Sequence, residues 1–269
     1  MSIRTSVGRN AFRLSRYRRT AVPVIPYSNT RSVSFGGGDE YVEIGDVAAL
    51  QFDRLSPFSM SAWFKTTAAG GAILAKREAV NYGRRRGYSV RFRRATVDQV
   101  SVLLTNSDNV NEIQVVCGFP LGTYSNGSWH HIVVTYDGSS IAAGVQVYLD
   151  GSSKTLVVEY DSLTDTILTT APFNIGREGG GEYSSHVEFI GLLDECAMYN
   201  KALSPSEVTS MYNTGEPIDL REHPTNANLV GWWRMGDVDT FPILTDRSIA
   251  GNNGTMVNME ASDIVIDVP

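Results

Sequence analysis

Residues 190–200 read IGLLDECAMYN, and apolar and polar side chains alternate along the second half of this stretch. Alternation with a period of two predicts a half-buried β-strand. One face of the strand is expected to carry Leu193, Glu195, Ala197 and Tyr199, and the other Asp194, Cys196, Met198 and Asn200. Asp194 and Glu195 are consecutive, so the pattern predicts that their carboxyl groups point to opposite faces.

The next residues, 201–215, read KALSPSEVTSMYNTG and carry the signals of one short helix. Ser204 is a favourable N-cap, Pro205 fits the first helical position, and Glu207 completes a capping box. Gly215 stands where a glycine that ends a helix belongs. The chain therefore predicts a strand that runs directly into a single capped helix.

Upstream, many short segments rich in Val, Ile, Thr and aromatic residues are separated by turn signals such as NSDN and SNGS. This spacing is typical of an all-β sandwich. In residues 57–66, PFSMSAWFKT, the side chains of Phe58, Met60, Ala62 and Phe64 share one face and predict a core strand. The two cysteines, Cys117 and Cys196, lie in apolar segments, which favours buried free thiols over a disulfide bridge.

Several of these segments resemble a known family. GLLDECAMYNKALSPSEVTSMYNTG resembles the closing signature of the laminin-G-like jelly-roll group in the concanavalin A-like lectin/glucanase superfamily. SVSFGGGDEYVEI from Ser32 and PFSMSAWFK from Pro57 resemble its opening strands, and WHHIVVTYDG from Trp129 with VQVYLDG from Val145 resembles its central hairpin. The resemblance implies an all-β, concanavalin A-like β-sandwich (jelly roll) with one short α-helix. The fold does not decide the function, because lectins, adhesins, enzymes and shell proteins share it.

Charge is distributed unevenly along the chain. The net charge is −6, yet residues 1–38 contain seven arginines and no acidic residue. Such asymmetry predicts a basic tail on an acidic body. We divide the chain into an extended basic N-terminal arm (1–30), a laminin-G-like jelly roll (31–215), a polar connector (216–228) and a C-terminal strand segment (229–269).

The arm admits four interpretations. It is an anchor that docks on an assembly, a solvated disordered tail, an Arg-rich transit peptide or a nucleic-acid-binding arm. The last is disfavoured because Phe12 and Tyr17 are the only aromatic residues among the arginines of the arm. The residues assigned to assembly are Arg4, Arg9, Arg13, Arg16, Arg18 and Arg19.

The C-terminal segment contains LVGWWRMGD (229–237) and LTDRSIAGNNGTMVNM (244–259). In the group that this chain resembles, a strand and turn of this kind open the jelly roll, whereas here they close the chain. The segment therefore either completes its own sandwich, which is the simpler case, or is exchanged with a neighbouring subunit. Trp232 and Trp233 should point to opposite faces, with one in the core and one outside it.

Catalysis is not expected. Glycan hydrolysis on this fold needs two carboxylates on one face of one strand, about 5 Å apart. The nearest candidates are Glu188, Asp194 and Glu195, and their spacing does not match. The four histidines form no recognisable catalytic or zinc-binding pattern.

A structural calcium ion (Ca2+) is the one cofactor that the resemblance implies. Its ligands would be carbonyls of the Gly36–Asp39 loop with Asp39, and the carboxylate of Asp194. The alternative is that Asp39 caps the turn and Asp194 accepts hydrogen bonds from nearby backbone N–H groups.

Glycan binding is the third chemistry considered, and its candidates are loop residues that can stack on or hydrogen-bond a sugar. They are Tyr82, Asn106, Asp108 and Tyr183, with Asn109, Tyr124 and Asn126 as further polar or aromatic loop positions. An arginine-rich run at residues 84–94 is either a patch for an anionic partner or, as we favour, a solvated surface paired with acids.

From these features we expect a non-enzymatic structural or adhesion protein on a virion surface, anchored by its arm as a capsid decoration or as a tail- or fibre-associated subunit. The C-terminal GWWRMGD…NNGT pattern is similar to modules of bacteriophage structural proteins. Its partners would be other copies of itself or a viral shell or tail, with no membrane span and no nucleic acid. The alternative is a carbohydrate-binding lectin module that recognises a host surface glycan with calcium, as an extracellular or cell-surface adhesin.

Overall fold

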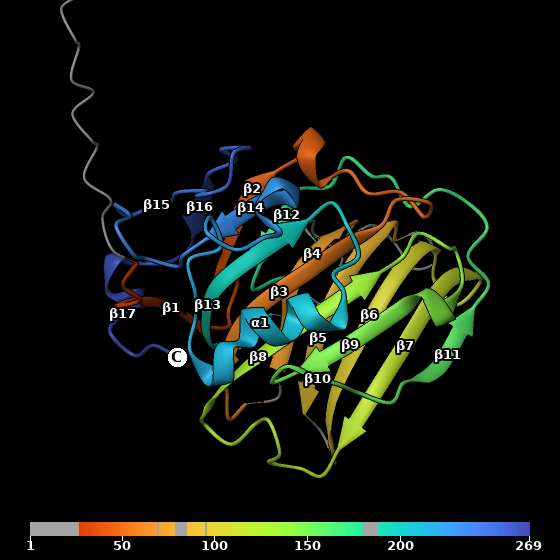
Figure 1. Cartoon of the computed structure of the whole chain (residues 1–269), viewed down its shortest axis with the longest axis horizontal. Helices are drawn as coiled ribbons and strands as arrows, with labels where there is room; N and C mark the ends of the chain where they lie inside the picture. Colours follow the sequence, from red (N-terminus) through yellow and green to blue (C-terminus); the bar gives the residue numbers. More distant parts are fainter. Residues whose placement is uncertain (1–26, 69, 79–84, 95, 180–187) are drawn as a thin grey trace, which may run out of the picture.

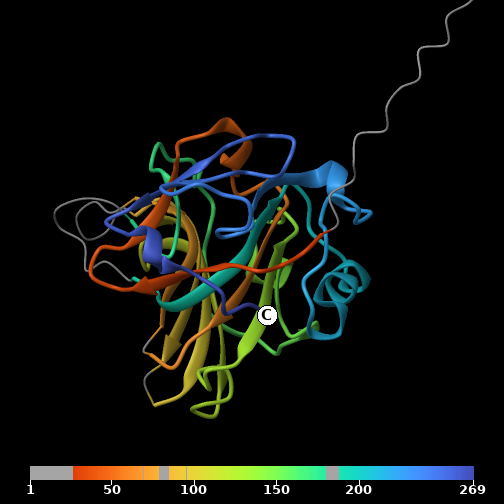
Figure 2. The ribbon, with the colours of Figure 1, turned by 90° about the vertical axis from the view of Figure 1, so that its left-hand side faces the viewer.

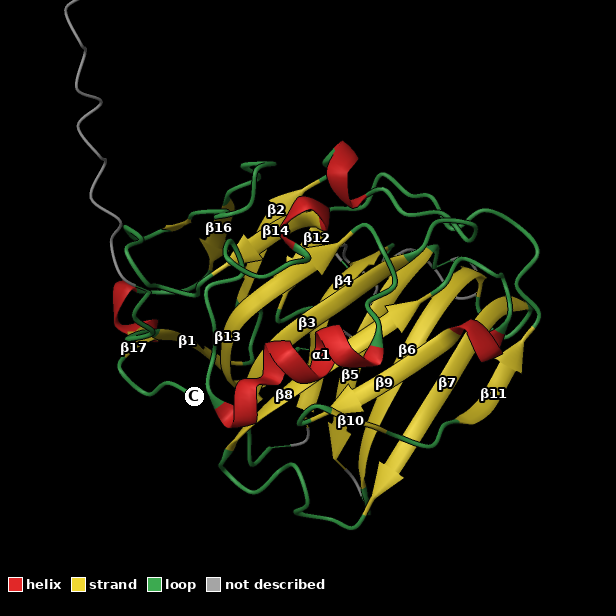
Figure 3. Cartoon of the chain, viewed as in Figure 1, coloured by secondary structure: helices red, strands yellow, loops and turns green. Residues whose placement is uncertain are grey.

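The computed structural model describes residues 27–68, 70–78, 85–94, 96–179 and 188–269. Two antiparallel sheets lie face to face as a β-sandwich (Figures 1 and 3). In spatial order, sheet A contains β10 (Ser152–Ser153), β9 (Val145–Leu149), β8 (Trp129–Tyr136), β3 (Phe58–Lys65), β13 (Ile190–Tyr199), β1 (Ser32–Gly36) and β17 (Ile264–Val265), with β14 (Leu229–Trp233) also paired to β13. This architecture confirms the predicted all-β jelly roll.

Sheet B covers the other side of the core. Its order is β11 (Val157–Asp161), β7 (Asn111–Phe119), β6 (Asp98–Ser107), β5 (Gly87–Arg94), β4 (Gly70–Arg77), β12 (Phe173–Ile175), β2 (Tyr41–Gly45), β16 (Gly254–Val257) and β15 (Ile243–Leu244). Short 3-10 turns occur at Ala48–Leu50, Ala142–Gly144, Asn213–Gly215, Asn226–Asn228 and Ala261–Asp263.

The main core lies between the two sheets. Phe58, Met60, Ala62 and Phe64 of β3 all point into it and are almost completely buried, as the alternation of that segment predicted. Cys117 and Cys196 are also in this core as free thiols. The sandwich is therefore held together by apolar packing and not by a disulfide.

A second apolar cluster covers the outer face of sheet A. The single helix α1 (Pro205–Tyr212) lies across this face (Figure 1), with Val208 and Met211 packed on the strands. Ser204 and Glu207 form the predicted capping box. The prediction that Gly215 ends the helix is wrong by two positions. Asn213 takes the left-handed conformation (φ 46°) that ends the helix. Asparagine tolerates this region better than most residues that carry a side chain.

The strand β13 departs from the predicted alternation at a β-bulge. Asp194 lies opposite Trp63 on β3, but Ala197 lies opposite Ser61, so β13 contains one extra residue between these pairs. Glu195 takes a left-handed conformation there, with φ of 47°. The prediction that Asp194 and Glu195 face opposite ways is therefore wrong, because an inserted residue shifts the phase of the strand. Both carboxyl groups lie on the outer face of sheet A.

The two flanks of the jelly roll meet at this bulge. β1 pairs with one half of β13 through Val33 opposite Leu193, and β14 pairs with the other half through Trp233 opposite Cys196. The start of β1 and the end of β14 therefore converge on Asp194 and Glu195. In addition, β17 pairs with β1 and β16 with β2, so the C-terminal segment pairs within its own chain (Figure 2).

Trp232 and Trp233 point to opposite faces of β14, as predicted, but neither is exposed. Trp233 lies in the main core, and Trp232 lies in the second cluster on the outer face of sheet A. The expectation that one of them would lie outside a core is wrong, because α1 and the connector cover that outer face. Leu220 of the connector is itself buried in the second cluster.

Candidate functional site

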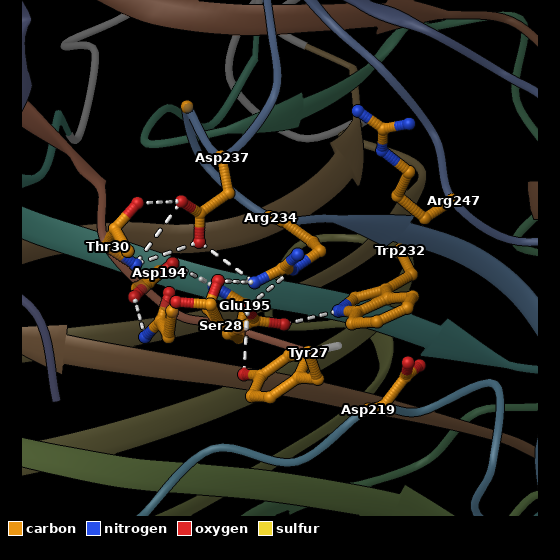
Figure 4. Close-up of polar contacts among 12 residues, drawn as sticks. Tyr27, Ser28, Thr30, Asp194, Glu195, Asp219, Trp232, Arg234, Asp237 and Arg247 are labelled. Carbon is orange, nitrogen blue, oxygen red and sulfur yellow. Dashed lines mark hydrogen bonds and ion pairs between the residues drawn. The ribbon is translucent and has the colours of Figure 1, made fainter. Parts of the chain in front are cut away.

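The carboxyl groups at the bulge are bound by residues 27–30, which precede β1. The Tyr27 hydroxyl donates a hydrogen bond to Glu195 Oε1 at 3.2 Å, and Asn29 Nδ2 donates to Asp194 Oδ2 at 2.8 Å. The last residues of the predicted arm are thus docked on the body of the protein (Figure 4). Because the side chains of Tyr27 and Asn29 both bind the carboxyl groups, residues 27–30 follow one fixed path across the bulge.

Residues that follow β14 complete the network from the other side. Arg234 Nε donates to Glu195 Oε1 at 3.0 Å, and its terminal nitrogen donates to Asp237 and to the Ser28 carbonyl at 2.8 Å. Its guanidinium lies 4.5 Å from the centre of the Tyr27 ring. Figure 4 shows Arg234 between the two carboxylates. Arg234 therefore joins three segments that are distant in sequence.

Two further residues, Trp232 and Thr30, donate hydrogen bonds to the carboxylates. Trp232 Nε1 donates to Glu195 Oε2 at 2.5 Å. Asp237 accepts from the Thr30 backbone N–H at 3.0 Å and from the Thr30 hydroxyl at 2.5 Å. Because every acidic residue here has donors within the chain, the network is a rigid support for whatever lies beside it.

Burial makes these carboxyl groups hard to ionise. Burial, reinforced by the neighbouring Glu195 carboxylate, raises the pKa of Asp194 well above its ordinary range. Burial also raises the pKa of Glu195 to about 7, against the opposing effect of Arg234 and its hydrogen-bond donors. Two carboxyl groups this close cannot both ionise easily, so we assign the shared proton to Asp194, which has no ion pair with any residue that the structure describes.

This assignment predicts that stability falls as the pH rises from 5 to 8. A carboxyl group whose pKa is raised in the fold contributes stability that is complete below about pH 4.5 and is lost as the pH passes through about 7. For Glu195 the effect is on the order of 3 kcal/mol. Asp194→Asn removes one of the two carboxyl groups whose pKa is raised in the fold, so the decline of the unfolding free energy with pH should flatten.

The measurement is urea unfolding at several pH values between 5 and 8. Glu222→Gln is the matched control, because this exposed residue lies outside the network and should keep the wild-type slope. Only the slope is compared, since an asparagine at 194 also loses one acceptor oxygen. An unchanged slope in Asp194→Asn would show that the pair does not share a proton.

A pocket of about 430 Å³ opens beside the network. Its size lies within the range of small-molecule sites. It is lined by Tyr27, Ser28, Thr30, Arg31, Arg221, Arg234, Gly236, Asp237, Val238, Asp239 and Arg247. All of these residues belong to the two flanks of the jelly roll, so the pocket exists only because those flanks converge on β13.

The loop at the edge of this pocket is conformationally strained. Val238 has φ of 55° although it is β-branched, and its side chain is 74% exposed. This conformation is rare for such a residue and costs on the order of 1–3 kcal/mol. Hydrogen bonds hold it in place: Arg247 donates to the Val238 carbonyl at 3.0 Å, and Asp239 accepts from the Thr245 backbone at 2.9 Å. Strain that surrounding contacts maintain in an exposed loop is a feature of binding sites.

The residues predicted for calcium do not form one site. Gly36 lies opposite Ile190 at the start of β13, and Asp39 follows in the next loop, whereas Asp194 lies four residues further along β13. At about 3.4 Å per residue these positions are separated by roughly 13 Å or more. Asp194 also already accepts bonds from Asn29 and the Glu195 backbone. The described residues hold no group of three or more His, Cys, Asp or Glu side chains that could bind a metal ion, and the two positions are too far apart to share one.

The residues predicted for glycan binding are not brought together either. Asn106 donates to the Thr166 carbonyl, and Asp108 forms ion pairs with Arg77 and Arg85. Their polar atoms are therefore engaged within the chain. Tyr82 and Tyr183 lie outside the described residues, as do the arm residues Arg4, Arg9, Arg13, Arg16, Arg18 and Arg19.

Sequence reasoning missed the residues that build the pocket. Arg234, Asp237 and Arg247 lie in motifs that we interpreted only as parts of a strand and a turn. The signal that could have revealed them is the charge placed next to the apolar strand end, in WWRMGD and TDRS. A charged residue that directly follows a buried strand often lies at the rim of a site.

A family model described as the concanavalin A-like lectin/glucanases superfamily, Laminin_G_3, matches residues 36–209. The match covers more than half of the chain. The protein belongs to the Laminin_G_3 family. The pocket residues 27–31 and 221–247 lie on either side of the matched segment, so the candidate site of this Laminin_G_3 protein lies outside the part of the chain that the family model matches.

Solved structures support the fold of this Laminin_G_3 protein. A structure from Bacteroides ovatus described as a "putative carbohydrate binding protein" is 16% identical with a TM-score of 0.55, covering 86% of this chain and 59% of that one. A heptameric SAP-like pentraxin from Limulus polyphemus is 14% identical with a TM-score of 0.50, covering 68% of this chain and 82% of that one. Among curated proteins, none matches the sequence.

Proposed function

We propose that this protein is a non-enzymatic carbohydrate-binding module and that its ligand occupies the pocket beside Arg234. The observation that carries the proposal is the pocket itself: about 430 Å³, braced by a buried polar network and bordered by a strained, exposed loop. Planar guanidinium groups and the Tyr27 ring supply the surfaces and donors that sugar hydroxyls need. The description of the Bacteroides ovatus structure as carbohydrate binding agrees with this assignment.

The state of the acidic residues supports a binding role over hydrolysis. Asp194 and Glu195 are buried, and the oxygens of Glu195 and Asp237 accept hydrogen bonds from Tyr27, Trp232, Arg234 and Thr30. Hydrolysis of a glycosidic bond needs two carboxyl groups that reach the bond from either side. Because these carboxyl groups are buried and hydrogen-bonded within the protein, we assign them to stabilising the pocket and not to hydrolysis.

The test compares two substitutions that add the same bulk at exposed valines. Val238→Trp narrows the pocket at its mouth, and Val110→Trp adds a tryptophan to the distant turn between β6 and β7, where Val110 is 71% exposed. We expect the full-length protein to bind glycans on a broad array. Val238→Trp should weaken that binding by about tenfold or more, and Val110→Trp should leave it unchanged.

Calorimetric titration with the glycan that binds most tightly on the array measures the affinity of the wild type and of both variants. The proposal fails if no glycan binds, with or without calcium. It fails equally if Val238→Trp binds as tightly as the wild type, because the pocket would then not hold the ligand.

The expected role on a virion surface stays a prediction, as does an extracellular location. The arginines proposed to anchor the protein lie outside the described residues, and what the structure adds is the point where that arm joins the body, at residues 27–30. Within the described part of the chain, no helix has the length and apolar character needed to cross a membrane.

A further inference from the structure

We infer that the glycan bound in this pocket carries an anionic group, a carboxylate or a sulfate, and that Arg31, Arg221 and Arg247 bind that group. The inference rests on the proposed function and specifies its substrate class. Two observations support it. The arginines around the pocket have hydrogen-bond donors that the protein does not use, and the oxygens of the acidic residues there already accept hydrogen bonds within the chain.

The three arginines have many donors that the protein does not use. A guanidinium has five N–H donors. Arg221 uses Nε and one terminal nitrogen on Asp219, and Arg247 uses one terminal nitrogen on the Val238 carbonyl and in an ion pair with Asp239 at 3.5 Å. Arg31 makes no side-chain hydrogen bond or ion pair with any residue that the structure describes. Apart from the buried Nε of Arg247, the remaining donors are available to an acceptor in the pocket.

The carboxylate oxygens of the acidic residues in the pocket, by contrast, already accept hydrogen bonds from the protein. Both oxygens of Asp237 accept from Thr30, and one also accepts from Arg234. Asp239 accepts from the Gly236 and Thr245 backbones, and its side chain is fully buried. The pocket therefore presents positive donors to a ligand and few acceptors. A neutral sugar needs both kinds of partner, whereas a carboxylate or sulfate needs donors alone.

Arg234 also lines the pocket but is not assigned to the anion. Its side chain is only 9% exposed, and its Nε and one terminal nitrogen already bind Glu195, Asp237 and the Ser28 carbonyl. Arg221 is 51% exposed and Arg247 is 27% exposed, so their free nitrogens can reach a ligand. The fold thus separates a buried structural arginine from more exposed arginines in the same pocket.

The experiment uses three defined probes with the full-length protein: trigalacturonic acid, the trigalactose obtained from it by carboxyl reduction, and a sulfated trigalactose. Binding is measured by calorimetry at low salt and again at 0.5 M NaCl. We expect at least one acidic probe to bind about tenfold or more tightly than the neutral one, and high salt to remove most of that difference. Preference for the carboxylate or the sulfate probe identifies the anionic group.

Substitutions then locate the anion. Arg221→Gln and Arg247→Gln should each weaken binding of the acidic probe by about fivefold to tenfold more than binding of the neutral probe. The matched control is Arg93→Gln on β5, where the arginine is exposed and outside the pocket, and it should alter neither affinity.

The outcomes separate the inference from the proposed function. If a neutral glycan binds in a way that Val238→Trp abolishes, and no acidic probe binds more tightly, the anionic inference is wrong and the carbohydrate-binding function stands. If acidic probes are preferred but Arg221→Gln and Arg247→Gln leave that preference intact, the assignment of the arginines is wrong. If no glycan of either kind binds, the proposed function fails and the inference fails with it.

Discussion

Arg234→Ala is expected to lower the free energy of unfolding by about 3–5 kcal/mol at pH 8. The substitution leaves Glu195 and Asp237 buried without a cation, and it also removes the contacts to the Ser28 carbonyl and the Tyr27 ring. The cost of an uncompensated buried charge exceeds the value of the pair itself. Because that cost falls when Glu195 takes up a proton, the loss should be smaller at pH 5 than at pH 8.

Arg221→Ala is the matched control. Arg221 lies 5.8 Å from the centre of the Trp232 ring, almost the same as the 5.7 Å of Arg234, but its ion pair with Asp219 is at the surface. An exposed ion pair contributes about 0–1 kcal/mol. Urea unfolding at both pH values measures the two variants. Equal losses at pH 8, or a loss in Arg234→Ala that does not depend on pH, would contradict the assigned role of the buried carboxylates.

Trp233→Ala is expected to lower the free energy of unfolding by about 3–5 kcal/mol. The side chain is fully buried in the main core, and its ring is stacked on Phe173 of sheet B with centroids 5.7 Å apart. Its indole nitrogen donates to the Asn252 carbonyl at 3.0 Å. Truncation leaves a cavity between the sheets and removes a contact that ties the C-terminal segment to the sandwich.

Ile249→Ala in the same segment provides the comparison, because that side chain is 98% exposed and should cost less than about 0.5 kcal/mol. Far-UV circular dichroism during urea unfolding reports both variants without relying on tryptophan fluorescence. A small effect of Trp233→Ala would mean that the C-terminal segment contributes little to the core, even though it supplies Met235, Leu244 and Met256 to it.

The amino-acid sequence by itself determined the architecture. The alternation in residues 57–66 placed four side chains in the core correctly, because a strand between solvent and core must have a period of two. Ser204 and Glu207 positioned the start of the only α-helix among the described residues, because capping depends on neighbours in the chain. The family resemblance likewise rests on local motifs, and the matched segment covers them.

The candidate site was decided by tertiary structure alone. The bulge at Glu195 turned two carboxyl groups to the same face, and no local pattern distinguishes that insertion from regular alternation. The pocket then joins residues 27–31 to residues 221–247, which are separated by most of the chain. Strand pairing at β13 brings them together, and pairing between distant strands depends on how all of the strands share one core. The sequence by itself therefore determined the fold, and only the folded structure determined which charged residues surround one pocket.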